Sequence, residues 1–237
     1  MSYSYEERTI NSKNPLAKYA HRNRVKKSTE FVALSHDESL MDFGCGDGNF
    51  LSIIHGNLQS NKLIGFEPYM ETKDSAKKID IKTKWDEVEA WCDSNGFFDV
   101  ITCFEVLEHF SRSRQAEAIT RIKSILDPNG RFIISVPIEK GLPVIPKNLR
   151  RWKMNRKGNE HIYTIGNVIS SFAGLKTSAL EKIRSSDEFL PHMGFYFDDL
   201  EEVFSESFEI KRTMLSPFDS LPYFFNSQIF YELIPLD

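Results

Sequence analysis

The sequence reads LMDFGCGDGNF from Leu40 to Phe50, and this stretch decides the fold. Its first four residues form the end of a predicted buried strand. Three glycines follow at alternate positions, Gly44, Gly46 and Gly48, where a backbone must turn tightly and approach a ligand closely. The order is GxGxG and not the dinucleotide-binding GxGxxG, because Asn49 stands where that motif needs glycine. The loop therefore favours a nucleoside ligand over a pyrophosphate.

Two carboxylates accompany the loop. Asp42 stands at the end of the first strand, where a carboxylate is unfavourable beside a phosphate but favourable beside an ammonium or sulfonium group. The second predicted strand, residues 62–66, is followed by Glu67, which lies 19 residues after Gly48. A carboxylate at that strand tip is placed to accept hydrogen bonds from both hydroxyls of a ribose. Strand, glycine loop, helix, strand and acid together predict a nucleoside site.

Strand and helix patterns alternate beyond the loop. Apolar runs predict buried strands at residues 39–43, 62–66, 99–104 and 131–136, with a weaker one at 80–84. Helical stretches lie between them, the clearest at residues 113–126, with Asn129 and Gly130 marking the end. This repetition predicts an α/β fold in which a doubly wound, mostly parallel sheet carries helices on both faces.

The flanks complete the plan of a single domain. Asn14 and Pro15 predict the start of a basic helix running towards Leu34. Residues 138–193 carry several prolines and glycines and a basic cluster, Lys147 to Lys157, and predict a helical or irregular insertion. A helix near 197–204 and two strands, 208–214 and 228–233, are expected to close the sheet as an antiparallel pair. The parts are a helical cap (1–38), a cofactor-binding core (39–137), a substrate-side insertion (138–193) and a C-terminal helix and strand pair (194–237).

Composition excludes several classes of protein. The chain has 237 residues, 41% hydrophobic and 27% charged, which is the balance of a globular protein. Its formal net charge of −4 excludes a basic field over the whole protein for nucleic acid. Three cysteines without a CxxC pair indicate neither a disulfide framework nor a zinc site. With no apolar run long enough for a membrane helix and no apolar signal segment, a cytoplasmic location is expected.

The stretch FDVITCFEVLEH, residues 98–109, adds a family resemblance. With the glycine loop and Glu67, it resembles the class I S-adenosylmethionine-dependent methyltransferases. The resemblance implies a Rossmann-like, seven-stranded sheet and S-adenosylmethionine as cofactor. By position, the loop and Asp42 would contact the methionine part, Glu67 the ribose, and Trp85 with Asp86 the adenine, although these last two depart from the family's usual pattern. The full implied cofactor set is Asp42, Gly44, Cys45, Gly46, Gly48, Glu67, Pro68, Trp85, Asp86, Phe104 and Glu105.

Further stretches indicate an acceptor. Residues 14–24, 135–143, 216–218 and 228–231 look similar to methyltransferases encoded with bacterial surface-polysaccharide biosynthesis, which implies O-methylation of a sugar on a nucleotide sugar or lipid-linked glycan. The basic cluster then suits the acceptor's phosphates or an anionic membrane surface, or is a solvated face. A hydroxyl is a poor nucleophile that benefits from a base, usually histidine. The candidates, in order, are His192, His109 and His161.

Two alternatives remain. Glu105, Glu108 and His109, with a distant His161 or His192, resemble the metal ligands of small-RNA 2′-O-methyltransferases. Similar stretches also occur in methyltransferases without metal, and the acidic net charge disfavours RNA, so no metal ligand is assigned. In the second alternative, the chain is a non-catalytic binding module that keeps the fold of a cofactor-binding methyltransferase. The sequence carries no signal for the oligomeric state.

Overall fold

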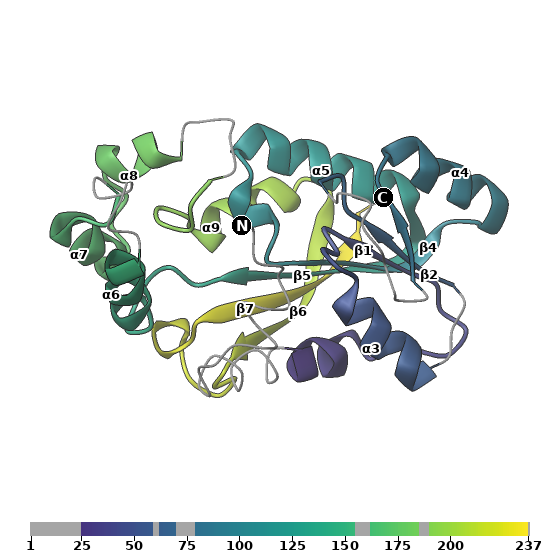
Figure 1. The fold of residues 1–237 in the computed structure, drawn as a ribbon, viewed down its shortest axis with the longest axis horizontal. Coiled ribbons are helices and arrows are strands. Elements are labelled where there is room, and N and C mark those ends of the chain that lie inside the picture. Colours follow the sequence, from purple (N-terminus) through teal and green to yellow (C-terminus); the bar gives the residue numbers. More distant parts are fainter. Residues whose placement is uncertain (1–24, 59–61, 70–78, 155–161, 185–189, 237) are drawn as a thin grey trace. The chain divides into compact units, whose positions relative to one another are not determined.

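The structure is a computed structural model that describes residues 25–58, 62–69, 79–154, 162–184 and 190–236 (Figure 1). Within these ranges, none of the helices is long and apolar enough to cross a membrane. The chain divides into two compact units, and each is described by itself.

The first unit holds the described residues up to Cys103 together with residues 125–133. Its strands are β1 (Leu40–Phe43), β2 (Leu63–Phe66), β3 (Asp80–Lys82) and β4 (Phe98–Phe104, whose last residue belongs to the second unit). Strand β1 pairs in parallel with both β2 and β4, and β2 pairs in parallel with β3. Helices α3 (Asn49–Leu58) and α4 (Trp85–Asn95) lie on opposite sides of these strands (Figure 1).

The strands of this unit are apolar because both faces of the sheet are covered. Leu40, Met41, Val100 and Ile101 are fully buried, as expected for a parallel sheet between two helical layers. Their carboxyl ends therefore carry the loops that are available to bind a ligand.

The second unit holds residues 104–124 and the described residues from Ile134 onward. It contains a short 3₁₀ turn, η1 (Leu107–His109), and helices α5 (Arg112–Ile125), α6 (Val144–Met154), α7 (Ile165–Ala173), α8 (Ser178–Ile183) and α9 (Phe197–Phe204). The insertion is thus helical where it is described. Two threonines cap the starts of α7 and α8, since Thr164 accepts a hydrogen bond from the Asn167 N–H and Thr177 accepts one from the Leu180 N–H.

Strands β6 (Phe208–Ser216) and β7 (Gln228–Pro235) pair in antiparallel fashion, from Phe208 opposite Pro235 to Ser216 opposite Gln228. The strand order of the sheet is β3-β2-β1-β4-β5-β7-β6, where β5 covers Leu126–Pro137. The predicted seven-stranded, mostly parallel, doubly wound sheet with an antiparallel end is therefore confirmed.

Most predicted boundaries differ from the observed ones by one or two residues, and the largest difference is at the start of β5. Strand β5 begins at Leu126, directly after α5, so Asn129 and Gly130 lie inside the strand and not between two elements. Within this strand, the Asp127 carboxylate accepts a 2.8 Å hydrogen bond from the Asn129 N–H. Strand β3 ends at Lys82, before the predicted residue 84, because α4 starts at Trp85.

The predicted N-terminal helix is seen over residues 25–32 only. Asn14, Pro15 and most of its basic face lie outside the described residues, as does His161.

Candidate functional site

The glycine loop after β1 has the backbone that its sequence requires. Gly44, Gly46 and Gly48 have φ angles of 75°, 54° and 71°, in the left-handed region that favours glycine. The Gly44 N–H donates a 2.8 Å hydrogen bond to the Phe66 carbonyl, so the loop starts against the end of β2. A Cβ added at Gly46 would meet no described atom within 4 Å, so the backbone at Gly46 faces open space.

Glu67 closes the other side of the loop. Its Oε2 accepts a 3.2 Å hydrogen bond from the Gly46 N–H, and its Oε1 accepts one of 3.2 Å from the Tyr69 N–H. Each carboxylate oxygen can accept a further hydrogen bond. The Gly46 contact brings this carboxylate against the loop, whereas contact with a ribose stays a prediction.

Asp42 is a buried acid beside the same loop. Its Oδ1 accepts a 2.7 Å hydrogen bond from the Thr102 hydroxyl. Burial raises the pKa of Asp42 to about 7; the Thr102 hydrogen bond opposes the rise and the nearby charge of Glu67 adds to it. A cation nearby would stabilise the ionised form. The group is thus suited to a positively charged ligand.

Packing explains another glycine that the sequence analysis did not single out. A Cβ added at Gly65, in the middle of β2, would lie 2.4 Å from the Cys45 Sγ. The buried Cys45 side chain therefore needs glycine on the neighbouring strand. This arrangement packs the loop closely onto the sheet, so Cys45 has a structural role whatever it contacts in a ligand.

An aromatic group stands at the ends of β1 and β2. Trp85 opens α4 and meets Phe66 edge-on at 5.3 Å between ring centroids and Phe43 at 6.3 Å. Trp85 is partly exposed, whereas the other two rings are buried. The predicted adenine contact Asp86 is exposed, as is Pro68, another residue of the predicted cofactor set. The partly exposed Trp85 ring is a surface on which a flat base could stack.

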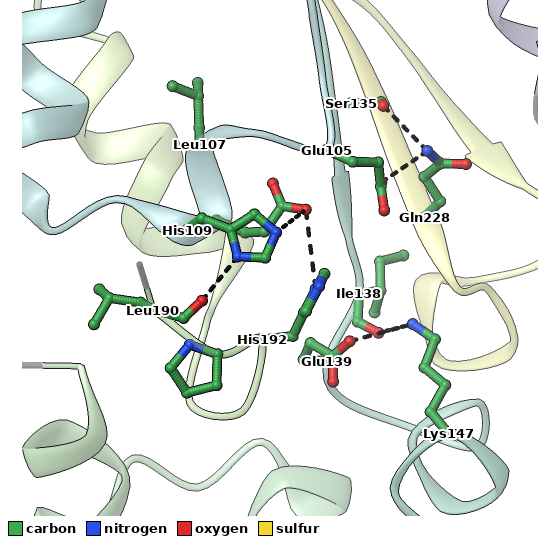
Figure 2. Close-up of polar contacts among 12 residues, drawn as sticks. Glu105, Leu107, His109, Ser135, Ile138, Glu139, Lys147, Leu190, His192 and Gln228 are labelled. Carbon is green, nitrogen blue, oxygen red and sulfur yellow. Dashed lines mark hydrogen bonds and ion pairs between the residues drawn. The ribbon is translucent and has the colours of Figure 1, made fainter. Parts of the chain in front are cut away.

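The remaining two predicted cofactor residues belong to the second unit. Phe104 meets the ring of Phe230 at 6.1 Å. Glu105 has a φ of 57°, which is strained for a residue with a long side chain, and its carboxylate accepts a 2.8 Å hydrogen bond from Gln228 Nε2. The same amide donates to the Ser135 hydroxyl at 3.1 Å (Figure 2). Glu105 is thus fixed at the end of β4.

The second unit also brings two predicted bases together. The ring centroids of His109 and His192 lie 4.7 Å apart, and the ring planes make an angle of 82° (Figure 2). The fully buried Glu108 contacts both rings. Its Oε1 lies 3.9 Å from His109 Nε2 and 3.9 Å from His192 Nδ1. From the sequence, Glu108 is a candidate only in the metal-ligand alternative. His192 is 83 positions from His109, so no local pattern could predict this contact.

Both imidazoles have lowered pKa values. Burial lowers the pKa of His109 and lowers that of His192 to about 3; for His192, Glu139 opposes the shift and Arg151 adds to it. A histidine with a pKa near 3 is a weak base. His192, the first-ranked base, is therefore less suited to that role than the sequence analysis expects.

Arg184 holds this region together and was missed. One of its guanidinium nitrogens donates to the backbone carbonyls of Glu108 (2.7 Å) and Pro191 (2.9 Å), and the other donates to that of Phe110 (3.2 Å). These bonds join η1 to the segment that carries His192. A single arginine in the insertion has no sequence signature that would predict such a role.

The basic cluster is in part internal. Arg151 forms a paired contact with the fully buried Glu139 carboxylate, at 2.7 and 3.1 Å, and Lys147 Nζ lies 3.4 Å from it. Despite burial, these two cations hold the pKa of Glu139 down at about 2. Lys147 and Arg151 are therefore only partly exposed and engaged by Glu139, which weakens both predicted roles, the phosphate site and the solvated face. The structure does not describe the side chains of the other four cationic residues of the cluster.

Comparison with known proteins adds independent findings. A family model described as "Methyltransferase domain" matches residues 16–172. Two curated proteins, each named ubiquinone biosynthesis O-methyltransferase, are similar to the chain. That of Yersinia enterocolitica is 28% identical over 133 residues, which cover 53% of this chain and 50% of the relative. That of Marinobacter nauticus is 27% identical over 184 residues, covering 68% and 76%. The match thus spans only half the length of the first relative.

A solved structure of similar fold is the TehB-like SAM-dependent methyltransferase of Corynebacterium glutamicum. Its TM-score is 0.53 at 14% sequence identity, with 94% of this chain and 100% of that chain covered. At this identity the likeness concerns the fold alone.

Proposed function

The chain belongs to the methyltransferase domain family, and from this premise we propose that it transfers a methyl group from S-adenosylmethionine to a hydroxyl of a small-molecule acceptor. The observation that carries the proposal is the Gly44–Gly48 loop, closed on one side by the Glu67 carboxylate and backed by the buried Asp42. The structure of similar fold is named SAM-dependent, which agrees with this choice of cofactor.

The residues of the first unit fit this cofactor. When bound, S-adenosylmethionine supplies an electrophilic methyl group on a sulfonium. Asp42 would stabilise its positively charged methionine part, and Glu67 would accept the ribose hydroxyls. The open space above Gly46 admits a ligand against the backbone, and Trp85 offers a ring to the adenine. Phe104 and Glu105 stay proposed contacts.

An oxygen acceptor has two supports. Both curated relatives are named O-methyltransferases, and the resemblance of residues 135–143 and 228–231 to polysaccharide methyltransferases favours a sugar hydroxyl. We retain the sugar as the specific proposal, with a phenolic hydroxyl as the competing outcome. A phosphate on the acceptor loses part of its support, because Lys147 and Arg151 are engaged by Glu139.

The acceptor-activating centre in this proposal is the group of Glu108, His109 and His192. Of its two partly buried imidazoles, that of His109 is the better suited to accept the hydroxyl proton, because the pKa of His192 is only about 3. Glu108 supplies the negative charge that favours a developing cation there.

The test is a methyl-transfer assay with radiolabelled S-adenosylmethionine and a panel of nucleotide sugars, lipid-linked glycans and phenols. Mass spectrometry should show one added methyl group on a hydroxyl of one class. Methylation of nitrogen or carbon acceptors alone would contradict the proposal, and cofactor binding without turnover across the panel would favour the non-catalytic module.

A further inference from the structure

Three side chains of the second unit converge with metal-binding atoms. They are Glu108 and His109 of η1 and His192 of the segment before α9, and one ligand atom from each lies within 4.8 Å of the others. We propose that these three residues bind one divalent transition-metal ion. The inference rests on the proposed function, since it assigns a chemistry to the acceptor-activating centre.

The tautomer of His109 supports this site. Its Nδ1 lies 2.8 Å from the Leu190 carbonyl (Figure 2), and a carbonyl oxygen only accepts, so Nδ1 carries the proton. In the neutral ring, Nε2 then presents a lone pair, 3.9 Å from the Glu108 carboxylate oxygen. Two electron-rich atoms that face each other are unfavourable unless a positive charge lies between them. Histidines that bind a metal through one ring nitrogen are usually oriented by a hydrogen bond from the other ring N–H to an acceptor such as a carbonyl.

The third ligand is equally suited. His192 Nδ1 is buried and makes no hydrogen bond with any described residue. It lies 3.9 Å from the same Glu108 oxygen. Ligand atoms about 2.0–2.2 Å from one ion lie less than about 4.4 Å apart, so small side-chain rotations would bring all three into coordination.

The ligand set selects a class of metal. Two imidazoles and one carboxylate suit Zn²⁺, Mn²⁺ or Co²⁺, whereas Mg²⁺ and Ca²⁺ prefer oxygen alone. Glu105, which lies three residues before Glu108, accepts a hydrogen bond from Gln228 and is not in the set. Three protein ligands leave a position for an oxygen of the acceptor.

The surroundings fix the ligands in place. Arg184 donates to the backbone carbonyls of Glu108 and Pro191, which ties the two ligand-bearing segments together. Its positive charge acts on the same carboxylate, and Glu139, Arg151 and Lys147 act on His192. The alternative is that Arg184 alone balances Glu108 and the cluster is structural.

Cobalt is the probe that separates these readings. Purified protein is stripped with EDTA, dialysed and titrated with Co²⁺, followed by visible absorption. We expect one Co²⁺ per chain, displaced by Zn²⁺, and a rise in Tm with Zn²⁺. Glu108→Gln and His192→Ala should each weaken Co²⁺ binding at least tenfold, while His36→Ala, which alters a histidine that is 75% exposed, should bind as the wild type does.

Absence of a saturable Co²⁺ spectrum in folded wild-type protein would overturn the inference, as would equal Co²⁺ affinity in wild type and both folded ligand variants. Binding of S-adenosylmethionine is measured on the same stripped samples. Cofactor binding without metal binding removes the metal site and leaves the proposed function standing, whereas metal binding without cofactor binding does the reverse.

Discussion

The Thr102 hydroxyl donates a 2.7 Å hydrogen bond to Asp42, and both side chains are buried at the carboxyl end of the parallel strands. The Asp42 pKa near 7 results from burial that this single neutral donor only partly offsets. The carboxyl group therefore changes its charge close to physiological pH, and a cationic ligand favours the ionised form.

The first prediction is that affinity for S-adenosylmethionine depends on pH. Below pH 7 the free protein holds a proton on Asp42 that must leave before the cationic ligand is stabilised. We expect Kd to rise up to about tenfold per pH unit below 7 and to level off above it. Calorimetry from pH 5 to pH 9 measures this, and Asp42→Asn should flatten the profile. A flat wild-type profile would remove Asp42 from the cofactor site.

The buried Asp42 carboxyl group should favour cofactor binding at the expense of the stability of the folded protein. The folded pKa lies above the ordinary value of 3.8, so stability linked to Asp42 is present below pH 4 and is lost as pH rises to about 7. Asp42→Asn removes a buried charge while the Thr102 hydroxyl keeps an acceptor. Its Tm should exceed that of the wild type at pH 8 but not at pH 4, while cofactor affinity falls. An unchanged or lower Tm at pH 8 would argue against the burial account.

Glu67→Ala should weaken S-adenosylmethionine binding strongly. The ribose would lose charge-assisted hydrogen bonds of about 1.5–3 kcal/mol each, and the loop would lose its contact through Gly46. The matched control is Glu87→Ala, because Glu87 also accepts from two backbone amides, those of Thr83 and Lys84. The control should lower Tm and leave Kd unchanged. Equal Kd values in both variants would place the ribose elsewhere.

The ion pair between Arg151 and Glu139 predicts that a second substitution restores the stability lost through the first. Arg151→Met leaves the buried Glu139 with one weaker partner and should cost about 3–5 kcal/mol of unfolding free energy. Adding Glu139→Gln should recover much of that loss, since the uncompensated charge is gone. Urea unfolding of both variants measures the difference. No recovery in the double variant would show that Arg151 stabilises the insertion by other contacts.

Local signals predicted the strands, the helix over residues 113–126 and the glycine loop because periodicity and glycine chemistry are properties of short segments. Glu67 was found for the same reason, as an acid at a strand tip. The contact of His192 with Glu108 and the pairing of Arg151 with Glu139 depend on tertiary packing of the insertion, which has no sequence period. A run of basic residues therefore suggested an exposed surface, although two of its members, Lys147 and Arg151, are partly buried and paired with Glu139.

Titration of S-adenosylmethionine into the purified protein tests the central claim most directly. Saturable binding of one cofactor per chain, displaced by S-adenosylhomocysteine and weakened at least tenfold in Glu67→Ala, is the predicted result. A folded wild-type protein that takes up no S-adenosylmethionine at pH 8, where Asp42 is ionised, would contradict it.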